Sequence, residues 1–131
     1  MGLDKSTRIL LIEDALATAE IVKAYLNAAT GTVLVETAGT LGAALERIAE
    51  NTFDLVIADL NLPDSMGLET LDRLTQATDR LIIVLTVEND PALRETAIAR
   101  VAYDFLHKSQ LSRARLGQVV RLATMQANTF R

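Results

Sequence analysis

Five short apolar runs alternate with stretches of helical periodicity along this chain, and that alternation constrains the fold more than any other feature. The runs occupy residues 8–12, 32–36, 53–59, 81–86 and 103–107. Residues 55–58 are apolar without alternation, which is typical of a strand covered on both faces. Strict alternation of strands and helices with short connections predicts an α/β protein whose parallel sheet carries helices on both faces.

The helices are predicted from the spacing of apolar residues and from signals at their ends. The first spans residues 16–29, and its inward face is expected to hold Ile21, Val22, Tyr25 and Leu26. The other inward positions are Leu41, Ala44, Leu45, Ile48, Leu68, Leu71, Leu74, Leu116, Val119, Val120 and Ala123. Thr40 and Asp90 are the expected N-caps of the second and fourth helices, and Gly31 is the expected end of the first.

The composition is that of one globular domain. Of 131 residues, 50% are hydrophobic, and no apolar run approaches the roughly 20 residues of a membrane-spanning helix. Cysteine is absent, which excludes disulfides and thiolate chemistry, and the net charge of −4 argues against direct binding of nucleic acid. We expect a cytoplasmic domain at residues 8–125 that does not insert into membranes, with an N-terminal extension at 1–7 and a tail at 126–131.

Polar residues stand where four of the predicted strands stop. Glu13 and Asp14 follow the first strand, Asp59 ends the third, Thr86 ends the fourth and Lys108 follows the fifth. The carboxyl ends of parallel strands meet at one edge of a sheet, and ligands bind at that edge in open α/β folds. We therefore expect these five residues to lie together in a functional site.

The three acids of this set favour a metal ion. Carboxylates crowded together repel one another, and a divalent cation relieves that repulsion. Oxygen ligands without His or Cys select a hard ion, so a Mg²⁺ site is expected at Glu13, Asp14 and Asp59. For the first two residues alone, a helix cap at Asp14 and a solvated Glu13 explain the sequence equally well.

Asp59 is the candidate nucleophile, because a carboxylate at the end of a buried central strand can form an aspartyl phosphate. The Lys108 ammonium and the metal would offset the charge of the incoming phosphoryl group, and the Thr86 hydroxyl would donate to one of its oxygens. Each residue also has an ordinary explanation as a turn exit, a solvated lysine or a strand end. Their joint placement favours the phosphoryl site.

The chain resembles the receiver domain of two-component response regulators over roughly residues 8–125. The matching motifs are the acid pair Glu13-Asp14, the loop Asp59-Leu-Asn-Leu-Pro-Asp-Ser-Met-Gly67, Thr86, and the run Asp104-Phe-Leu-His-Lys108. The resemblance implies a doubly wound, flavodoxin-like sheet of five parallel strands in the order 2-1-3-4-5. It also implies a signalling domain rather than an enzyme, with at most self-phosphorylation from acyl phosphates and autodephosphorylation.

The resemblance further implies a role for each residue of the acidic site. Asp59 would accept a phosphoryl group from a phosphohistidine, and Mg²⁺ would be held by Glu13, Asp14, Asp59 and the backbone carbonyl of Asn61. The phosphoryl donor would be a histidine kinase or a histidine phosphotransfer domain. The signal would pass to a downstream protein target or a fused output domain, and a phosphorylation-linked dimer is left open.

In such domains a threonine and a lysine sense the phosphoryl group, and these would be Thr86 and Lys108. The aromatic Phe105, half-buried at rest, would rotate inward when Thr86 moves. The switched surface would lie on the fourth helix, the fifth strand and the fifth helix. The flanking residues are Asn61, Val87 and Glu88, of which Asn61 and Glu88 are expected to tune the lifetime of the phosphoryl group.

Two residues depart from the family pattern. Val87 stands where a small residue usually follows the threonine, and it is expected to narrow access to Asp59. Ser109 stands where proline, commonly in cis, often follows the lysine. A trans bond is expected here, since a cis non-proline bond costs about 2.5–4 kcal/mol, and Ser109 is a candidate cap of the last helix. His107, directly before Lys108, is expected to be an ordinary surface residue.

Two other functions stay open from the sequence alone. A Mg²⁺-dependent hydrolase would also use Asp59 as a covalent nucleophile, but it usually has a second acid where this chain has Asn61. A degenerate receiver that only binds partners would have lost an acid or Lys108, and this chain keeps them all. The residues therefore favour the phosphoacceptor.

Overall fold

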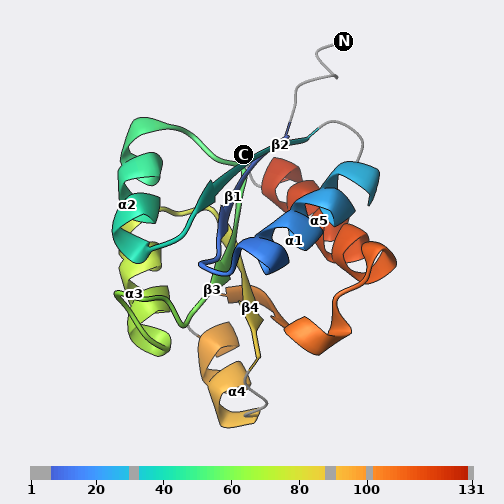
Figure 1. Ribbon diagram of the computed structural model, residues 1–131. Helices are drawn as coiled ribbons and strands as arrows, with labels where there is room; N and C mark the ends of the chain where they lie inside the picture. The colour runs from blue at the N-terminus through green and yellow to red at the C-terminus, as the bar shows by residue number, and fades with distance from the viewer. Residues whose placement is uncertain (1–6, 30–32, 88–90, 100–101, 130–131) are drawn as a thin grey trace.

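A computed structural model describes residues 7–29, 33–87, 91–99 and 102–129 of the chain (Figure 1). Strands and helices alternate along the chain as the sequence predicts. In order, they are β1 (Thr7–Ile12), α1 (Leu16–Ala29), β2 (Val33–Ala38), α2 (Leu41–Glu50), β3 (Leu55–Asp59), α3 (Leu68–Ala77), β4 (Leu81–Thr86), α4 (Pro91–Ala99), β5 (Ala102–His107), the short 3₁₀ helix η1 (Lys108–Gln110) and α5 (Arg113–Thr129).

The five strands form one parallel sheet in the order β2-β1-β3-β4-β5, which confirms the predicted doubly wound topology. β3 is the central strand, and all five of its residues are buried. A strand with neighbours on both sides and helices on both faces is shielded from water in every direction. Asp59, its last residue, is therefore held at the end of the most enclosed strand.

The helices cover the two faces of the sheet (Figure 1), and alternate strand residues supply two separate cores. Leu10, Val56 and Ile82 point to the face packed by α2, α3 and α4. Leu11, Ile57 and Ile83 point to the opposite face, where α1 and α5 pack against the sheet and each other. Because both faces are covered, functional side chains are left to the edge where the strands end.

The strand registers bring the functional ends into line. Asp59 pairs with Leu85, so Thr86 stands one residue beyond it on β4. Thr86 pairs in turn with His107, so Lys108 stands one residue beyond it on β5. This alignment depends on a shift of register between Ile82 and Ile83, which pair with Ala102 and Asp104 and leave Tyr103 without a partner in the ladder.

One of the expected helix signals can be checked and is present, and the expected inward positions of the first helix are confirmed in part. The Thr40 side chain accepts a hydrogen bond from the Ala43 N–H at 3.0 Å and caps α2, as predicted. Val22 and Leu26 of α1 are buried, but Ile21 is 48% exposed, so its prediction as an inward residue is wrong. The expected signals at Gly31 and Asp90 lie outside the described residues.

The predicted role of Ser109 at the last helix is also wrong. Ser109 belongs to η1, and it is the Ser112 hydroxyl that accepts a hydrogen bond from the Arg115 N–H at 3.0 Å, at the start of α5. The expected trans peptide bond is present, since none of the described residues has a cis bond. The helix itself continues to Thr129.

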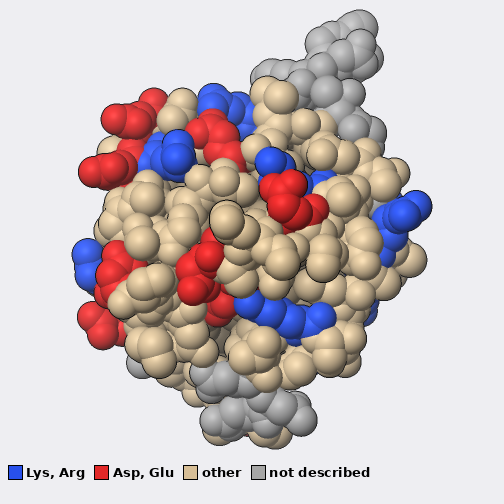
Figure 2. Space-filling view, in the orientation of Figure 1, with Lys and Arg blue, Asp and Glu red and all other residues tan. Residues whose placement is uncertain are grey.

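The charged side chains are dispersed over the face of the molecule shown in Figure 2. On the face shown in Figure 2, Lys and Arg are interspersed with Asp and Glu and form no continuous basic stripe. Among the described residues, no helix has both the length and the apolar character that a membrane crossing requires.

Candidate functional site

The structure brings the polar strand-end residues together at the carboxyl edge of the sheet. Three of them are almost completely enclosed: Glu13 is 3% exposed, Asp59 6% and Thr86 1%. Asp14 is exposed beside them. Buried acids are uncommon unless they are paired or bind metal, so this edge differs chemically from the rest of the surface.

Lys108 links two of the acids. Its Nζ lies 2.8 Å from Asp59 Oδ2, as an ion pair with hydrogen-bond geometry, and 2.5 Å from Glu13 Oε1 as a second ion pair. Burial opposes the charge of the ammonium, but the contacts with Asp59 and Glu13 outweigh it and raise the pKa of Lys108. The side chain is thus a permanent cation between two enclosed carboxylates.

Burial of the Glu13 carboxylate carries a desolvation cost that Lys108 does not fully offset. Desolvation raises the pKa of Glu13, although Lys108 and the Ala15 N–H, which donates to Oε2 at 3.1 Å, act in the opposite direction. One ligand oxygen from each of Glu13, Asp14 and Asp59 lies within 4.8 Å of the others. Three carboxylates near a single ammonium leave an excess of negative charge, and an all-oxygen set of this kind fits a hard divalent cation.

The loop after β3 fixes the orientation of the Asp59 carboxylate. The Asn61 N–H donates to Asp59 Oδ1 at 2.9 Å, while Lys108 holds Oδ2. The Asn61 side chain in turn accepts a hydrogen bond from the Gly67 N–H at 3.2 Å. Gly67 has φ 63°, a conformation that favours glycine, and it closes the loop at the start of α3.

Two further anchors hold this loop, and neither was predicted from the sequence. The fully buried Thr70 of α3 donates to the Leu60 carbonyl at 2.7 Å, and its hydroxyl lies 2.7 Å from Ser65 Oγ. Asp64 accepts hydrogen bonds from the Leu41 and Gly42 N–H groups at 2.8 and 3.0 Å, so it caps α2 from outside that helix. These bonds lower the pKa of Asp64, that to Gly42 most.

One residue beside the site differs from its predicted surroundings, and the others are described here as the structure has them. Phe105 is 4% exposed and belongs to the core on the α4 side, rather than being half-buried. Val87 is 63% exposed. His107 is partly exposed at the surface, as expected, and its ring nitrogens contact the Val87 carbonyl and Ser109. Glu88 lies outside the described residues.

The comparison with protein families identifies this arrangement. The model of the response regulator receiver domain matches residues 9–121, which include all the strand-end residues of the site. The chain belongs to the response regulator receiver domain family. It is therefore a receiver domain of two-component response regulators, a class of signalling rather than catalytic domains.

Individual relatives agree with this assignment. The receiver domain is 33% identical over 119 residues to the cell cycle transcriptional regulator CtrA of Caulobacter vibrioides, covering 87% of this chain and 50% of that protein. It is 32% identical over 102 residues to the response regulator ArlR of Staphylococcus haemolyticus, covering 78% of this chain and 46% of that protein. The chain thus spans about half the length of these curated relatives.

Solved structures show the same architecture. The signal receiver domain of a LuxO repressor protein from Vibrio parahaemolyticus has a TM-score of 0.86 at 29% identity, covering 95% of this chain and 94% of that one. A CheY-like receiver domain from Methanospirillum hungatei also has a TM-score of 0.86, at 23% identity, covering 97% of this chain and 100% of that one. The latter likeness supports the fold alone.

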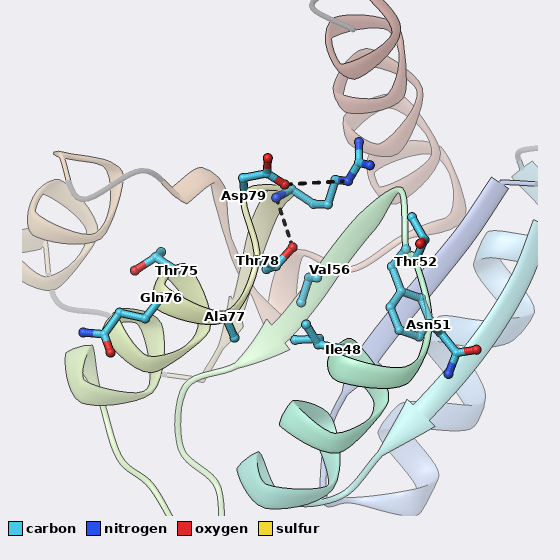
Figure 3. Close-up of a pocket in the computed structure, with 11 residues that line it drawn as sticks. Ile48, Asn51, Thr52, Val56, Thr75, Gln76, Ala77, Thr78 and Asp79 are labelled. Atoms are coloured by element: carbon cyan, nitrogen blue, oxygen red, sulfur yellow. Dashed lines mark hydrogen bonds and ion pairs between the residues drawn. The ribbon is translucent and has the colours of Figure 1, made fainter.

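The receiver domain also has a hollow at the opposite edge of the sheet (Figure 3). Its volume is about 460 Å³, and its lining includes Ile48, Phe53, Val56, Thr78 and Arg80. Phe53 and Arg80 precede the starts of β3 and β4, whereas Asp59 and Thr86 lie where the same two strands end. The hollow is therefore separate from the acidic site.

Proposed function

We propose that this receiver domain accepts a phosphoryl group on Asp59 and uses it as a signal. The observation that supports the proposal is the position of Asp59: a 6% exposed carboxylate that pairs with the Lys108 ammonium and lies beside the acid pair Glu13-Asp14. A nucleophile in a phosphoryl transfer needs positive charge nearby and a fixed orientation. Lys108 and the Asn61 N–H supply these for the two oxygens of Asp59.

In the proposed transfer, a carboxylate oxygen of Asp59 forms a bond to phosphorus as the P–N bond of a phosphohistidine breaks. The donor imidazole leaves with the bonding electron pair and is then protonated. Lys108, freed in part from its contact with Asp59, would bind an oxygen of the acyl phosphate, and the buried Thr86 hydroxyl would donate to another. In this proposal both residues respond directly to the phosphoryl group.

Glu13, Asp14 and Asp59 would hold Mg²⁺, with the Asn61 carbonyl as a further ligand. The ion would neutralise charge on the phosphoryl oxygens. A histidine kinase or histidine phosphotransfer domain would be the donor. The changed surface of α4, β5 and α5 would act on a protein target or fused output domain, in the cytoplasm, without this domain itself contacting nucleic acid.

Mass spectrometry after incubation with Mg²⁺ and acetyl phosphate tests the proposal. We expect a single phosphoryl adduct that Asp59→Asn abolishes. Asp64→Asn is the matched control: it makes the same chemical change in the same loop, outside the acidic cluster, and should retain the adduct. Rapid release of many phosphates per chain would indicate a hydrolase instead. No adduct with any phosphoryl donor would indicate a domain that only binds partners, and either result contradicts the proposal.

A further inference from the structure

His107 joins two segments that lead away from the acidic site. Its Nε2 lies 2.8 Å from the Val87 carbonyl oxygen, on the chain leaving β4. Its Nδ1 lies 3.0 Å from the Ser109 backbone nitrogen and 2.6 Å from Ser109 Oγ, within η1. One half-buried ring thus bridges both positions at which this receiver domain departs from its family pattern.

The partners of the ring define its chemical form. A carbonyl oxygen only accepts, so the hydrogen shared with Val87 must be carried by Nε2. A backbone N–H only donates, so Nδ1 must present its lone pair to Ser109. The neutral ring with its hydrogen on Nε2 satisfies both. A proline in place of Ser109 would have no N–H to donate, so the departure at this position is what completes the arrangement.

The bridge is adjacent to both residues assigned to sense a phosphoryl group. Val87 directly follows Thr86, and His107 directly precedes Lys108. Thr86 and His107 are also paired across β4 and β5. A displacement of the Thr86 main chain toward Asp59 would therefore pull the Val87 carbonyl, one peptide bond away, against a hydrogen bond anchored on β5.

We propose that His107, the Val87 carbonyl and Ser109 form a clamp that holds the chain leaving β4 in its resting position. His107 is then a positioning residue for the switch, and phosphoryl uptake on Asp59 has to open the clamp. This inference rests on the proposed phosphoacceptor function. Because the clamp stabilises the resting state only, its removal favours the phosphoryl-bound state.

The resting clamp can be observed directly, because His107 is the single histidine of the chain. The full chain labelled with ¹⁵N-histidine at neutral pH should give one imidazole spectrum, with a protonated Nε2 and an unprotonated Nδ1. A ring with its hydrogen on Nδ1, or one averaging between the two tautomers, would overturn the clamp. This measurement requires neither phosphorylation nor any variant.

The preference of the clamp for the resting state is measured through the affinity for beryllium trifluoride in the presence of Mg²⁺. Beryllium trifluoride is a mimic of a carboxylate-bound phosphoryl group. His107→Phe keeps a ring of similar size but removes both nitrogens, and we expect it to bind the mimic about fivefold more tightly, the factor for one ordinary hydrogen bond. Tyr103→Phe removes a polar atom from another ring on β5 and should bind like the wild type. In the wild type, the mimic should change the imidazole spectrum of His107.

If a folded His107→Phe chain binds beryllium trifluoride as tightly as the wild type or more weakly, the clamp does not favour the resting state. The same follows if the mimic leaves the wild-type spectrum of His107 unaltered. If His107→Phe fails to fold, the two wild-type spectra still decide the matter. Wild-type protein that binds no mimic would refute the proposed phosphoacceptor function, and with it the preference of the clamp for the resting state. In that case the resting tautomer alone still tests whether the clamp exists.

Discussion

Lys108 Nζ lies 2.8 Å from Asp59 Oδ2, although the two residues are 49 positions apart in the chain. The contact places a cation against the enclosed carboxylate at the end of the central strand. In the structure this ammonium pairs with the enclosed carboxylate, and in the proposed phosphoryl transfer it would bind an oxygen of the acyl phosphate. The proposal therefore couples the stability of this receiver domain to its reactivity through one side chain, and each can be measured separately.

Lys108→Met keeps the length of the side chain and removes its charge. Since Asp59 and Glu13 are then enclosed without a cation, we expect a loss of about 1–3 kcal/mol of unfolding free energy at neutral pH in metal-free buffer. Urea unfolding followed by circular dichroism measures the loss. The matched control is Lys23→Met on α1, whose ammonium is 3.8 Å from the exposed Glu20 and should matter little. Equal unfolding free energies for the two variants would show that the ion pairs of Lys108 make no net contribution to stability.

Added Mg²⁺ should stabilise the folded chain if the acid cluster holds it. At about a hundred times the dissociation constant, a ligand specific for the folded state adds about 2.7 kcal/mol to the unfolding free energy. Thermal unfolding over a Mg²⁺ titration measures this. Asp14→Asn should abolish most of the gain, whereas Glu50→Gln, the same loss of charge at the end of α2, should preserve it. If both variants keep the stabilisation by Mg²⁺, the ion acts by screening surface charge in general rather than by binding at the acid cluster.

The Asp64 cap predicts a specific dependence of stability on pH. Hydrogen bonds from Gly42 and Leu41 lower the pKa of Asp64 from its ordinary value of 3.8, so the folded state binds fewer protons than the unfolded state in this range. The stabilisation is complete above pH 3.8 and is lost as the pH falls through the lowered pKa. Asp64→Asn should thus be less stable than wild type at pH 7, with a difference that shrinks toward pH 2.

Chemical unfolding at both pH values measures that difference. Asp79→Asn is the control, because its side chain is 99% exposed and lies at the other edge of the sheet. A gap between Asp64→Asn and wild type that stays constant with pH would mean that the cap stabilises α2 by its shape rather than by its charge.

Gly67→Ala tests the backbone of the loop that follows Asp59. Gly67 has φ 63° and ψ −142°, a combination that residues with a Cβ rarely adopt, and an added Cβ would meet no atom within 4 Å. The cost should therefore be conformational rather than steric, about 1–3 kcal/mol. Gly42→Ala on α2 is the matched control, since its Cβ would meet Asp64 Oδ2 at an ordinary 3.5 Å. If Gly67→Ala loses no more unfolding free energy than Gly42→Ala, this explanation is contradicted.

The fold was predictable because its determinants are local. Apolar runs and helical spacing gave the bounds of α1 and β4 directly, and one buried strand with a polar end indicated both the centre of the sheet and its reactive edge. Ile21 was misplaced because it is next to Val22 on the helix and so about 100° away from it, outside the narrow stripe that meets the sheet.

The site was only partly predictable, because much of it depends on contacts between distant segments. Asp64 caps a helix 22 residues earlier in the chain, and a helix-capping residue usually precedes its own helix. His107 reaches the Val87 main chain 20 residues away, and a carbonyl acceptor leaves no mark in the sequence. The available signal was indirect: Val87 and Ser109, the two unusual residues, proved to be the partners of one ring.

The shift of register at the start of β5 has a consequence for how the chain tolerates changes in length. Tyr103 is skipped by the ladder between Ala102 and Asp104. Deleting Tyr103 would remove the irregularity and still leave His107 opposite Thr86, with the lysine beside Asp59. A deletion between residues 104 and 107 would instead either draw Lys108 back by one position or close the irregularity by moving Tyr103 and the residues after it to new places in the ladder. Tyr103 is thus the place where this strand can be shortened without losing its cation.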